Sequence, residues 1–303
     1  MTFELLIPTY NRAALLQRCL DSVDRAVRPK ELILTVTVID NNSNDNTRQI
    51  AEQFIDKCSM RARYIFVGRP GKSAALNEVL AQTDSDFVGF IDDDEQLDRT
   101  WFEVAYREFA NNPQLDYIGG PYLPDWQQEP PEWLPPAYPG AIGIVPRPHR
   151  LPFSREFAGV LMGGNAVVRR SVLERVLPYP EDLGNIGGKI RSGEDEVIYQ
   201  RLLDAGAIGM VVPELVIYHW IPAQRLTKKY HRRWVIGRGI SRGKQLRDAG
   251  FSEPGMFGIP RHQIGTAIRG LRLMWCGRSS QERFTAQLSI LDCLATLYGR
   301  YFY

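Results

Sequence analysis

The sequence predicts an α/β protein built around one mostly parallel, mixed sheet. Its first 120 residues alternate short apolar runs, which are typical of buried strands, with segments of helical periodicity. Polar loops follow three of these runs. Such alternation predicts right-handed crossovers between parallel strands, and open sheets of this kind bind ligands where their strands end. The chain of 303 residues is long enough to bury a substantial core.

The first half supplies five predicted strands and four predicted helices. The strands cover residues 3–7, 32–39, 64–67, 87–91 and 117–120. Apolar residues at helical spacing predict helices over 13–27, around 50–55, from 71 onward and over 101–109. Pro8 ends the first strand, and the turn-forming run of residues 40–47 ends the second.

The second half predicts fewer strands and more helix. A short strand within residues 157–170 leads into a helix over 171–176, and an amphipathic helix over 197–203 ends at Gly206. Two strands over 208–214 and 215–220 are expected to close the core. The tail from residue 224 carries a belt of basic side chains, followed by a last helix with an apolar face between residues 284 and 302. We expect core packing for that face, with a second subunit or a membrane surface as the alternatives.

Four consecutive carboxylates, Asp92 to Glu95, follow the apolar strand over 87–91. Packing so many carboxylates together is costly unless a cation neutralises them, and hard oxygen ligands suit Mg²⁺ or Mn²⁺. A solvated acidic turn before a helix is the alternative. Because a buried strand directly precedes the acids, we favour a divalent metal at the carboxyl end of this strand.

Polar residues at the other strand ends fit a nucleotide diphosphate. The first loop offers Tyr10 and Arg12, the second offers Asp40, and Lys72 stands at a helix start after Gly71. Each has an ordinary structural explanation by itself, and the pattern around Lys72 is not a complete phosphate-binding loop. Together, an aromatic ring, an acid that accepts from a base or ribose, a lysine and metal-binding carboxylates predict a nucleotide-diphosphate pocket.

Four motifs, in this order and spacing, resemble those of family-2 glycosyltransferases with the GT-A fold. They are Ile7-Pro8-Thr9-Tyr10-Asn11-Arg12, Ile39-Asp40-Asn41-Asn42-Ser43 with Asp45-Asn46-Thr47, Gly71-Lys72-Ser73-Ala74-Ala75-Leu76-Asn77, and Ile91-Asp92-Asp93-Asp94. The resemblance covers residues 3 to 225. It implies a Rossmann-like nucleotide-sugar-binding half over residues 1–120 and an acceptor half over 121–225. A helical C-terminal extension over 226–303 is expected to follow.

The resemblance also implies roles for residues of the first half. Asp40 would contact the base, Asp92 would contact the ribose and the metal, and Asp94 would bind the metal on the diphosphate. Lys72 is a looser match that would help with the phosphates. The extra charge of Asp93 and Glu95 is expected behind the metal ligands or facing solvent. The expected nucleotide-binding residues are Pro8, Thr9, Tyr10, Arg12, Asp40, Asn42, Lys72, Asp92 and Asp93.

In the second half, the resemblance implies the catalytic base. Inverting sugar transfer needs a carboxylate that takes the proton of the acceptor hydroxyl. The family's position for this base matches Asp195, with Glu194 as the alternate, whereas capping of the following helix is the other explanation of these acids. His219 follows an apolar strand where relatives often have a histidine. We expect it to complete a site for Mn²⁺ or Mg²⁺ with Asp92 and Asp94, although a purely structural histidine is the alternative.

Contacts to the donor and acceptor are expected from two further segments. A glycine-rich turn resembles the family's second-half signature and allows close approach of the backbone to a ligand. A tight turn would explain it equally well. It consists of Gly163, Gly164 and Asn165. Residues 121–152 hold half of the 20 prolines, which excludes regular helix and predicts a long acceptor-side insertion. Its Trp126 and Trp133 are expected to stack on sugar rings or to hold the insertion against the body.

Composition and charge exclude several classes of protein. The net charge of +2 argues against nucleic acid as a partner. The four cysteines have no paired spacing, so they predict neither a zinc site nor a disulfide framework, and a reducing compartment is favoured. No signal peptide or membrane span is apparent, so we expect a cytoplasmic location. Peripheral contact of the basic C-terminal region with the inner face of the plasma membrane stays open, as does a homodimer.

Taken together, the motifs and the resemblance imply an inverting, metal-dependent transferase that acts in cell-surface polysaccharide synthesis. It would move a sugar from a nucleotide diphosphate sugar, with a UDP-sugar favoured, to a hydroxyl of a glycan or lipid-linked saccharide. A sugar-nucleotide nucleotidyltransferase is a weaker alternative because its glycine-rich, arginine-bearing first loop is missing. A non-catalytic member of a polysaccharide assembly complex is also weaker, since Asp92, Asp94 and Asp195 are all in place.

Overall fold

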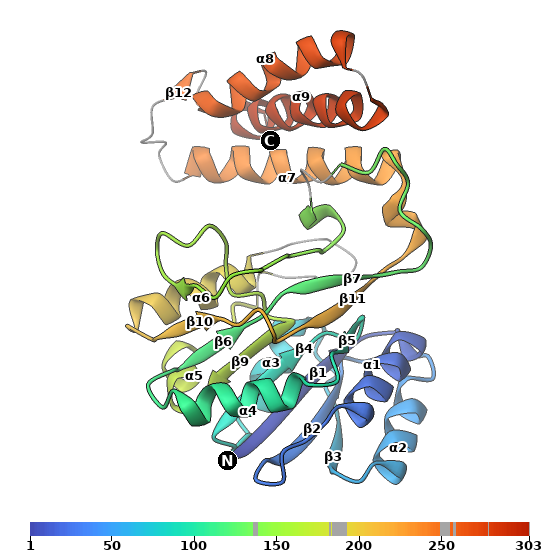
Figure 1. The fold of residues 1–303 in the computed structure, drawn as a ribbon, viewed down its shortest axis with the longest axis vertical. Helices are drawn as coiled ribbons and strands as arrows, with labels where there is room; N and C mark the ends of the chain where they lie inside the picture. The colour runs from blue at the N-terminus through green and yellow to red at the C-terminus, as the bar shows by residue number, and fades with distance from the viewer. Residues whose placement is uncertain are drawn as a thin grey trace. The chain divides into compact units, whose positions relative to one another are not determined.

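The computed structural model describes residues 1–135, 139–181, 183, 193–248, 255–256, 259–277 and 279–302. The chain forms two compact units (Figure 1). The first unit comprises residues 1–123 and 146–219, and the second comprises residues 124–145 and 220–303. The domain boundaries expected at residues 120 and 225 stay predictions.

An eight-stranded mixed sheet forms the centre of the first unit, with the strand order β3-β2-β1-β4-β9-β6-β10-β8. Strands β3, β2, β1 and β4 run parallel to one another, as do β6 and β10, whereas β9 lies antiparallel between β4 and β6. Their bounds are β1 (Thr2–Thr9), β2 (Ile33–Asp40), β3 (Arg61–Phe66), β4 (Phe87–Ile91), β6 (Tyr117–Gly119), β8 (Pro152–Phe153), β9 (Asn165–Arg169) and β10 (Gly209–Val211). The predicted mostly parallel sheet is confirmed.

A smaller three-stranded sheet has the order β5-β11-β7 and carries the strands next to the acids. Its bounds are β5 (Glu95–Leu97), β7 (Tyr122–Trp126) and β11 (Ile217–Ile221). Strands β5 and β11 pair antiparallel, with His219 opposite Glu95. Strands β7 and β11 each run from one unit into the other. Within its described residues, the proline-rich segment forms β7, β8 and one short 3-10 helix, η1 (Pro139–Ala141), and contains no α-helix.

The helices of the first unit follow the predicted apolar spacing. In α1, the buried residues Leu16, Leu20 and Val23 recur at intervals of three and four, which places them on the face toward the core. The helices of this unit are α1 (Ala13–Arg25), α2 (Thr47–Lys57), α3 (Lys72–Leu80), α4 (Trp101–Asn111), α5 (Arg170–Val176) and α6 (Glu194–Asp204).

The second unit contains the C-terminal helices and residues 124–145 of the proline-rich segment. Its helices are η2 (Ala223–Leu226), α7 (Lys228–Asp248), α8 (Arg261–Cys276) and α9 (Ser280–Tyr301), and its two short strands are β12 (Gly255–Met256) and β13 (Ile259–Pro260). Helix α9 starts with a capping box, in which the Ser279 hydroxyl accepts from the Glu282 amide at 3.0 Å. Helix α9 packs against both α7 and α8. The predicted helical C-terminal part is confirmed. None of the described helices combines the length and hydropathy that a membrane span needs.

One buried amide joins distant segments of the first unit. The side-chain oxygen of Asn165 accepts a hydrogen bond from the indole nitrogen of Trp101 at 2.9 Å. Its side-chain nitrogen donates to the carbonyls of Pro121 at 3.1 Å and Leu215 at 2.8 Å. Asn165 is 1% exposed, so these bonds form away from water, where an unmet polar group is costly.

We expect Asn165→Ala to lower the free energy of unfolding by about 3 kcal/mol, because it leaves one buried donor and two buried acceptors without this partner. Urea denaturation measures the change. Asn111→Ala, at the exposed end of α4, is the control and should change the free energy by less than about 0.5 kcal/mol. Equal effects of the two variants would contradict the structural role of Asn165.

Candidate functional site

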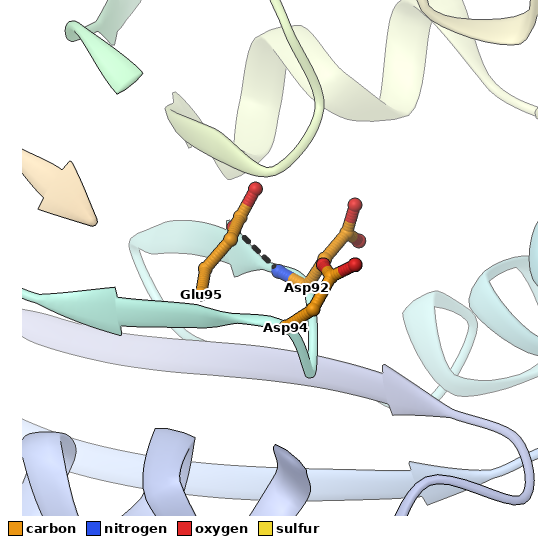
Figure 2. Close-up of side chains that lie close together, drawn as sticks. All are labelled: Asp92, Asp94 and Glu95. Carbon is orange, nitrogen blue, oxygen red and sulfur yellow. Dashed lines mark hydrogen bonds between the residues drawn. The ribbon is translucent and has the colours of Figure 1, made fainter. Parts of the chain in front are cut away.

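Strand β4 delivers the acids to the carboxyl edge of the sheet. All five residues of β4 are buried, and the chain turns directly after it into β5. Side-chain oxygens of Asp92, Asp94 and Glu95 lie within 4.8 Å of one another. Figure 2 shows the three side chains rising from this turn toward the same side. Three carboxylates this close repel one another strongly unless positive charge lies beside them.

Two basic side chains provide that charge. Lys72, the first residue of α3, forms an ion pair with Asp92. Burial alone would lower the pKa of Lys72, but Asp92 and Asp195 raise it above its usual value. Arg12 Nη1 lies 2.9 Å from Asp93 Oδ1 and 3.1 Å from Asp94 Oδ2. The first and third motifs thus contact the acids through Arg12 and Lys72.

The other two acids of the run, Asp93 and Glu95, are buried at 4% and 2% exposure. Of the two alternatives expected for them, a position facing solvent is wrong, because the surrounding segments cover both side chains. The other alternative, a position behind the metal ligands, stays a prediction. Asp93 accepts a hydrogen bond from the Thr9 hydroxyl at 2.7 Å, and burial raises its pKa to about 6 although Arg12 opposes the shift. Glu95 accepts from the backbone amide of Asp92 at 2.7 Å. Burial, and then the charges of Asp92 and Asp94, raise the pKa of Glu95 well above its usual range.

The acids and His219 fit a divalent metal. The register of β5 and β11 sets His219 opposite Glu95, and its Nε2 lies 3.8 Å from Asp94 Oδ2. His219 is 7% exposed. Carboxylate oxygens and an imidazole nitrogen together suit Mn²⁺, and carboxylates alone suit Mg²⁺. The structure therefore brings Asp94 close both to Asp92 and to His219, and it adds Glu95 to the carboxylate cluster. The only sequence signal for Glu95 as a ligand is its place in the acidic run.

The predicted base lies beside a glycine turn that also touches the acid cluster. Asp195 stands in the first turn of α6, and its Oδ2 accepts from the Gly163 amide at 2.9 Å. A side chain at Gly163 would collide with the Asp195 carboxylate, and one at Gly164 would collide with the Glu95 carboxylate. Residues 163 and 164 thus pass between two acids that are 100 positions apart, and only glycine fits this close approach.

Burial raises the pKa of Asp195 to about 6, whereas the charge of Lys72 and the Gly163 hydrogen bond oppose the shift. Such a carboxylate is mostly ionised at neutral pH yet more basic than an exposed one, as a proton acceptor needs to be. Glu194, the alternate, is the first residue of the same helix and is partly exposed.

The loops expected to hold the nucleotide lie at neighbouring strand ends. Thr9, the last residue of β1, pairs with Asp40, the last residue of β2. Asp40 is 2% exposed and accepts from the Ser43 amide at 2.8 Å and from the Tyr64 hydroxyl at 2.7 Å. Pro8 is buried in β1, whereas Tyr10 is 57% exposed, and Asn42 is exposed with a φ of 69°. Nucleotide contact by these residues stays a prediction.

Sequence reasoning missed two positioning residues, Tyr64 and Asn41. Tyr64 on β3 fixes the Asp40 carboxylate through its hydroxyl. Asn41 accepts from the Gly71 amide at 2.7 Å and donates to the Arg69 carbonyl at 2.7 Å, so it holds the loop that leads to Lys72. Asn41 lies inside a recognised motif, but its partners stand about 30 positions away, where local pattern gives no signal.

The two tryptophans of the proline-rich segment pack within the second unit. Trp133 packs on a cluster of Ala141, Val235, Phe284 and Leu288, and its ring meets Phe284 edge to face at a centroid distance of 5.1 Å. Trp126 packs on a cluster of Ile142, Ile221 and Leu226. The alternative that the rings hold this segment in place is thus supported, and sugar stacking by them stays a prediction. Asn165 of the glycine turn is likewise explained by its structural hydrogen bonds, and a binding role for it stays a prediction.

We expect Asn41→Ala to speed hydrogen exchange at the Gly71 amide by about tenfold or more, because the amide loses its side-chain acceptor. Hydrogen-exchange mass spectrometry of a peptide that contains residues 68–72 measures this. Asn46→Ala is the control, since Asn46 is exposed and makes no side-chain cap bond to α2. Unchanged exchange in Asn41→Ala would show that this side chain does not hold the loop.

Comparison with known sequences gives one family and several relatives. The model of the family described as glycosyl transferase family 2 matches residues 4–177. Glycosyltransferase AglE of Haloferax volcanii is 26% identical over 240 residues, which cover 78% of this chain and 71% of that protein. The poly(ribitol-phosphate) beta-N-acetylglucosaminyltransferase TarS of Staphylococcus aureus is 29% identical over 105 residues, and the match spans 35% of this chain but only 18% of TarS.

Two solved structures share the fold. Mannosyltransferase PcManGT from Pyrobaculum calidifontis, in complex with GDP-Man and Mn²⁺, has a TM-score of 0.62 at 17% identity and covers 99% of this chain and 87% of its own. Residues 1–349 of S. aureus TarS, in complex with UDP, have a TM-score of 0.51 at 16% identity and cover 96% of this chain and 90% of their own. These likenesses confirm the GT-A fold that the motifs imply.

Proposed function

The chain belongs to glycosyl transferase family 2, and from this premise we propose that it transfers a sugar from a nucleotide diphosphate sugar to a hydroxyl group with inversion at the anomeric carbon. The observation that carries the proposal is the contact of residues 163 and 164 with both Asp195 and Glu95. That contact joins a carboxylate suited to accept a proton to a carboxylate cluster suited to hold a metal. In the proposed transfer, the base and the metal site act on the same anomeric carbon, so the two groups must lie close together.

The nucleotide would bind across the ends of β1, β2 and β4. Thr9, Tyr10 and Arg12 lie at the end of β1 and just beyond it, while Asp40 and Asn42 lie at and after the end of β2. We propose base and ribose contacts for these residues and for Asp92. Lys72 and Arg12 form ion pairs with the acids, which supports a role for both in adding positive charge beside a bound diphosphate.

Asp92, Asp94 and His219, with Glu95 close by, would hold Mn²⁺ or Mg²⁺. Such an ion would stabilise the negative charge that grows on the leaving diphosphate. The mannosyltransferase PcManGT, which shares the fold, was solved with Mn²⁺ and a nucleotide sugar, which supports this choice of group.

Asp195 would act as the base. The acceptor oxygen forms a bond to the anomeric carbon while the bond from that carbon to the diphosphate oxygen breaks, and the electron pair leaves with the nucleotide diphosphate. The hydroxyl proton passes to the Asp195 carboxylate, which is held by the Gly163 amide. Attack from the side opposite the diphosphate inverts the configuration.

The donor that we favour is a UDP-sugar, and the TarS structure with UDP supports that choice. For the acceptor we propose a glycan or a lipid-linked saccharide of cell-surface polysaccharide synthesis. Gly163 and Gly164 lie nearest to the proposed base and would contact the donor sugar or acceptor.

A thermal-shift panel of UDP, GDP, dTDP and CDP, each with and without Mn²⁺, tests the nucleotide and metal sites. We expect one nucleotide with Mn²⁺ to raise the melting temperature by about 5 °C at a concentration about 100 times its Kd. Asp94→Ala should abolish the metal-dependent part, since it removes a ligand. Asp84→Ala, at an exposed acid outside the cluster, should behave as the wild type. No shift with any nucleotide would favour the non-catalytic alternative.

The role of Asp195 predicts a pH profile. Because the base works when ionised and its pKa is raised to about 6, kcat/KM should rise with pH up to about 6 and then level off. Asp195→Asn should lower the release of nucleotide diphosphate in the presence of sugar acceptors by about 10²- to 10⁴-fold, while the nucleotide-dependent thermal shift remains. Glu194→Gln is the matched control and should keep activity within about threefold. The reverse result would assign the base to Glu194.

A further inference from the structure

Helix α8 has one packed face and one exposed apolar face. Gln263 donates to the Thr296 hydroxyl of α9 at 2.7 Å, and a side chain at Gly270 would meet the Ala286 backbone of α9. Residues 263 and 270, seven positions apart, therefore mark the face that packs on α9. Figure 1 shows α9 between α7 and α8, so α8 is the outer helix of the three.

The apolar face is a stripe along α8. Ile264, Ile268, Leu271 and Trp275 recur at positions i, i+4, i+7 and i+11, which is the spacing of one helix face. Ile268 is 61% exposed, Leu271 is 53% exposed and Trp275 is 89% exposed. Single exposed apolar residues need no explanation, but an aligned row with a tryptophan at its end marks an interaction surface.

Basic side chains border the stripe on the side away from α9. With 100° per residue, Arg261 and Arg272 follow directly after the stripe around the helix, and Arg269 lies beyond them. All three are exposed, and the sequence of α8 contains no aspartate or glutamate. The order around α8 is thus a packed face, an apolar stripe and a row of arginines.

The surrounding charge points to an anionic partner. Residues 224–303 contain 15 Lys and Arg but only four Asp and Glu, whereas the whole chain has 37 and 35. The remaining residues are therefore acidic overall, and the positive charge is concentrated in the last 80 residues. One of the four acids, Asp292, is buried and already paired with Arg238 and Arg242 at 3.0 and 3.2 Å.

We propose that α8 lies in the interface of an anionic lipid bilayer, with its apolar stripe among the acyl chains and its arginines at the head groups. A helix with an apolar face and a basic polar face binds such a surface through both burial and charge. Arginine stems also cover apolar surface while their guanidinium groups stay at the polar level. This inference goes beyond the proposed transfer reaction and does not depend on it.

Two other partners fit the surface less well. A two-fold contact between two copies of α8 would bring arginines against arginines with no carboxylate of α8 between them. A soluble polyanion would pair with the arginines but would leave the apolar stripe in water. The lipid surface satisfies both features together.

Vesicle flotation of the full chain tests the proposal. We expect binding to vesicles of equimolar phosphatidylcholine and phosphatidylglycerol, and at least about tenfold weaker binding to phosphatidylcholine alone. The variant Ile268→Ser/Leu271→Ser/Trp275→Ser should weaken binding to the anionic vesicles by about tenfold or more. The control Ile33→Ser/Leu151→Ser/Ile208→Ser changes three exposed apolar residues of the first unit and should bind as the wild type.

Further measurements distinguish a lipid surface from a second copy of the chain and from a soluble polyanion. Trp275→Phe keeps the stripe apolar, so it should still bind, but the blue shift of tryptophan emission on binding should be smaller than in the wild type. Far-ultraviolet circular dichroism and thermal melting verify that each variant folds.

Suppose that the triple serine variant binds anionic vesicles as well as the wild type, while Arg261→Gln/Arg269→Gln/Arg272→Gln loses binding. Charge alone would then explain the binding, and the proposal is overturned. It is equally overturned if the serine variant changes a dimer into a monomer in sedimentation, or if the wild type binds neither kind of vesicle.

Discussion

Repulsion among four consecutive carboxylates is the constraint on which the rest of the first unit depends. Residues 92–95 stand at the end of a fully buried strand, and water cannot screen Asp93 or Glu95. Lys72 from α3 pairs with Asp92, and Arg12 from the loop after β1 pairs with both Asp93 and Asp94. The backbone amide of Asp92 donates to Glu95. The segments around the cluster thus offset the repulsion among its carboxylates even without a bound ligand.

Sheet register brings the remaining groups to the cluster. The antiparallel pairing of β5 with β11 places His219 opposite Glu95, and the parallel pairing of β1 with β2 places Thr9 opposite Asp40. A shift of one residue in either pair would turn these side chains to the other face of the sheet. Asn165, by tying Trp101 to two loop carbonyls, fixes the start of β9 directly after the glycine turn. The geometry of the site is therefore a property of the sheet and of its buried bonds.

Much of this was predictable from sequence, because apolar runs, acidic strand ends and helical spacing are local signals. The strands of the sheet, the α1 core face and the place of the acids follow from such patterns. The burial of Glu95 does not, since it depends on Gly164, which is 69 positions away. Nor does the packing of Trp133 on Phe284, which lie 151 positions apart. Contacts between residues that are distant in the sequence determine whether a charged side chain faces water and whether an aromatic ring is buried. The local periodicity of the sequence does not show such contacts.

The central place of α9 has a consequence for the order of folding. Both neighbours of α9 precede it in the chain, and so does the proline-rich segment whose Trp133 packs on Phe284. During synthesis, α7 and α8 cannot make their contacts with α9 until residues 280–301 have left the ribosome. All residues of the first unit precede residue 220, so that unit is complete earlier. The first unit is thus expected to fold during translation, whereas the contact of Trp133 with Phe284 can form only after α9 has been made.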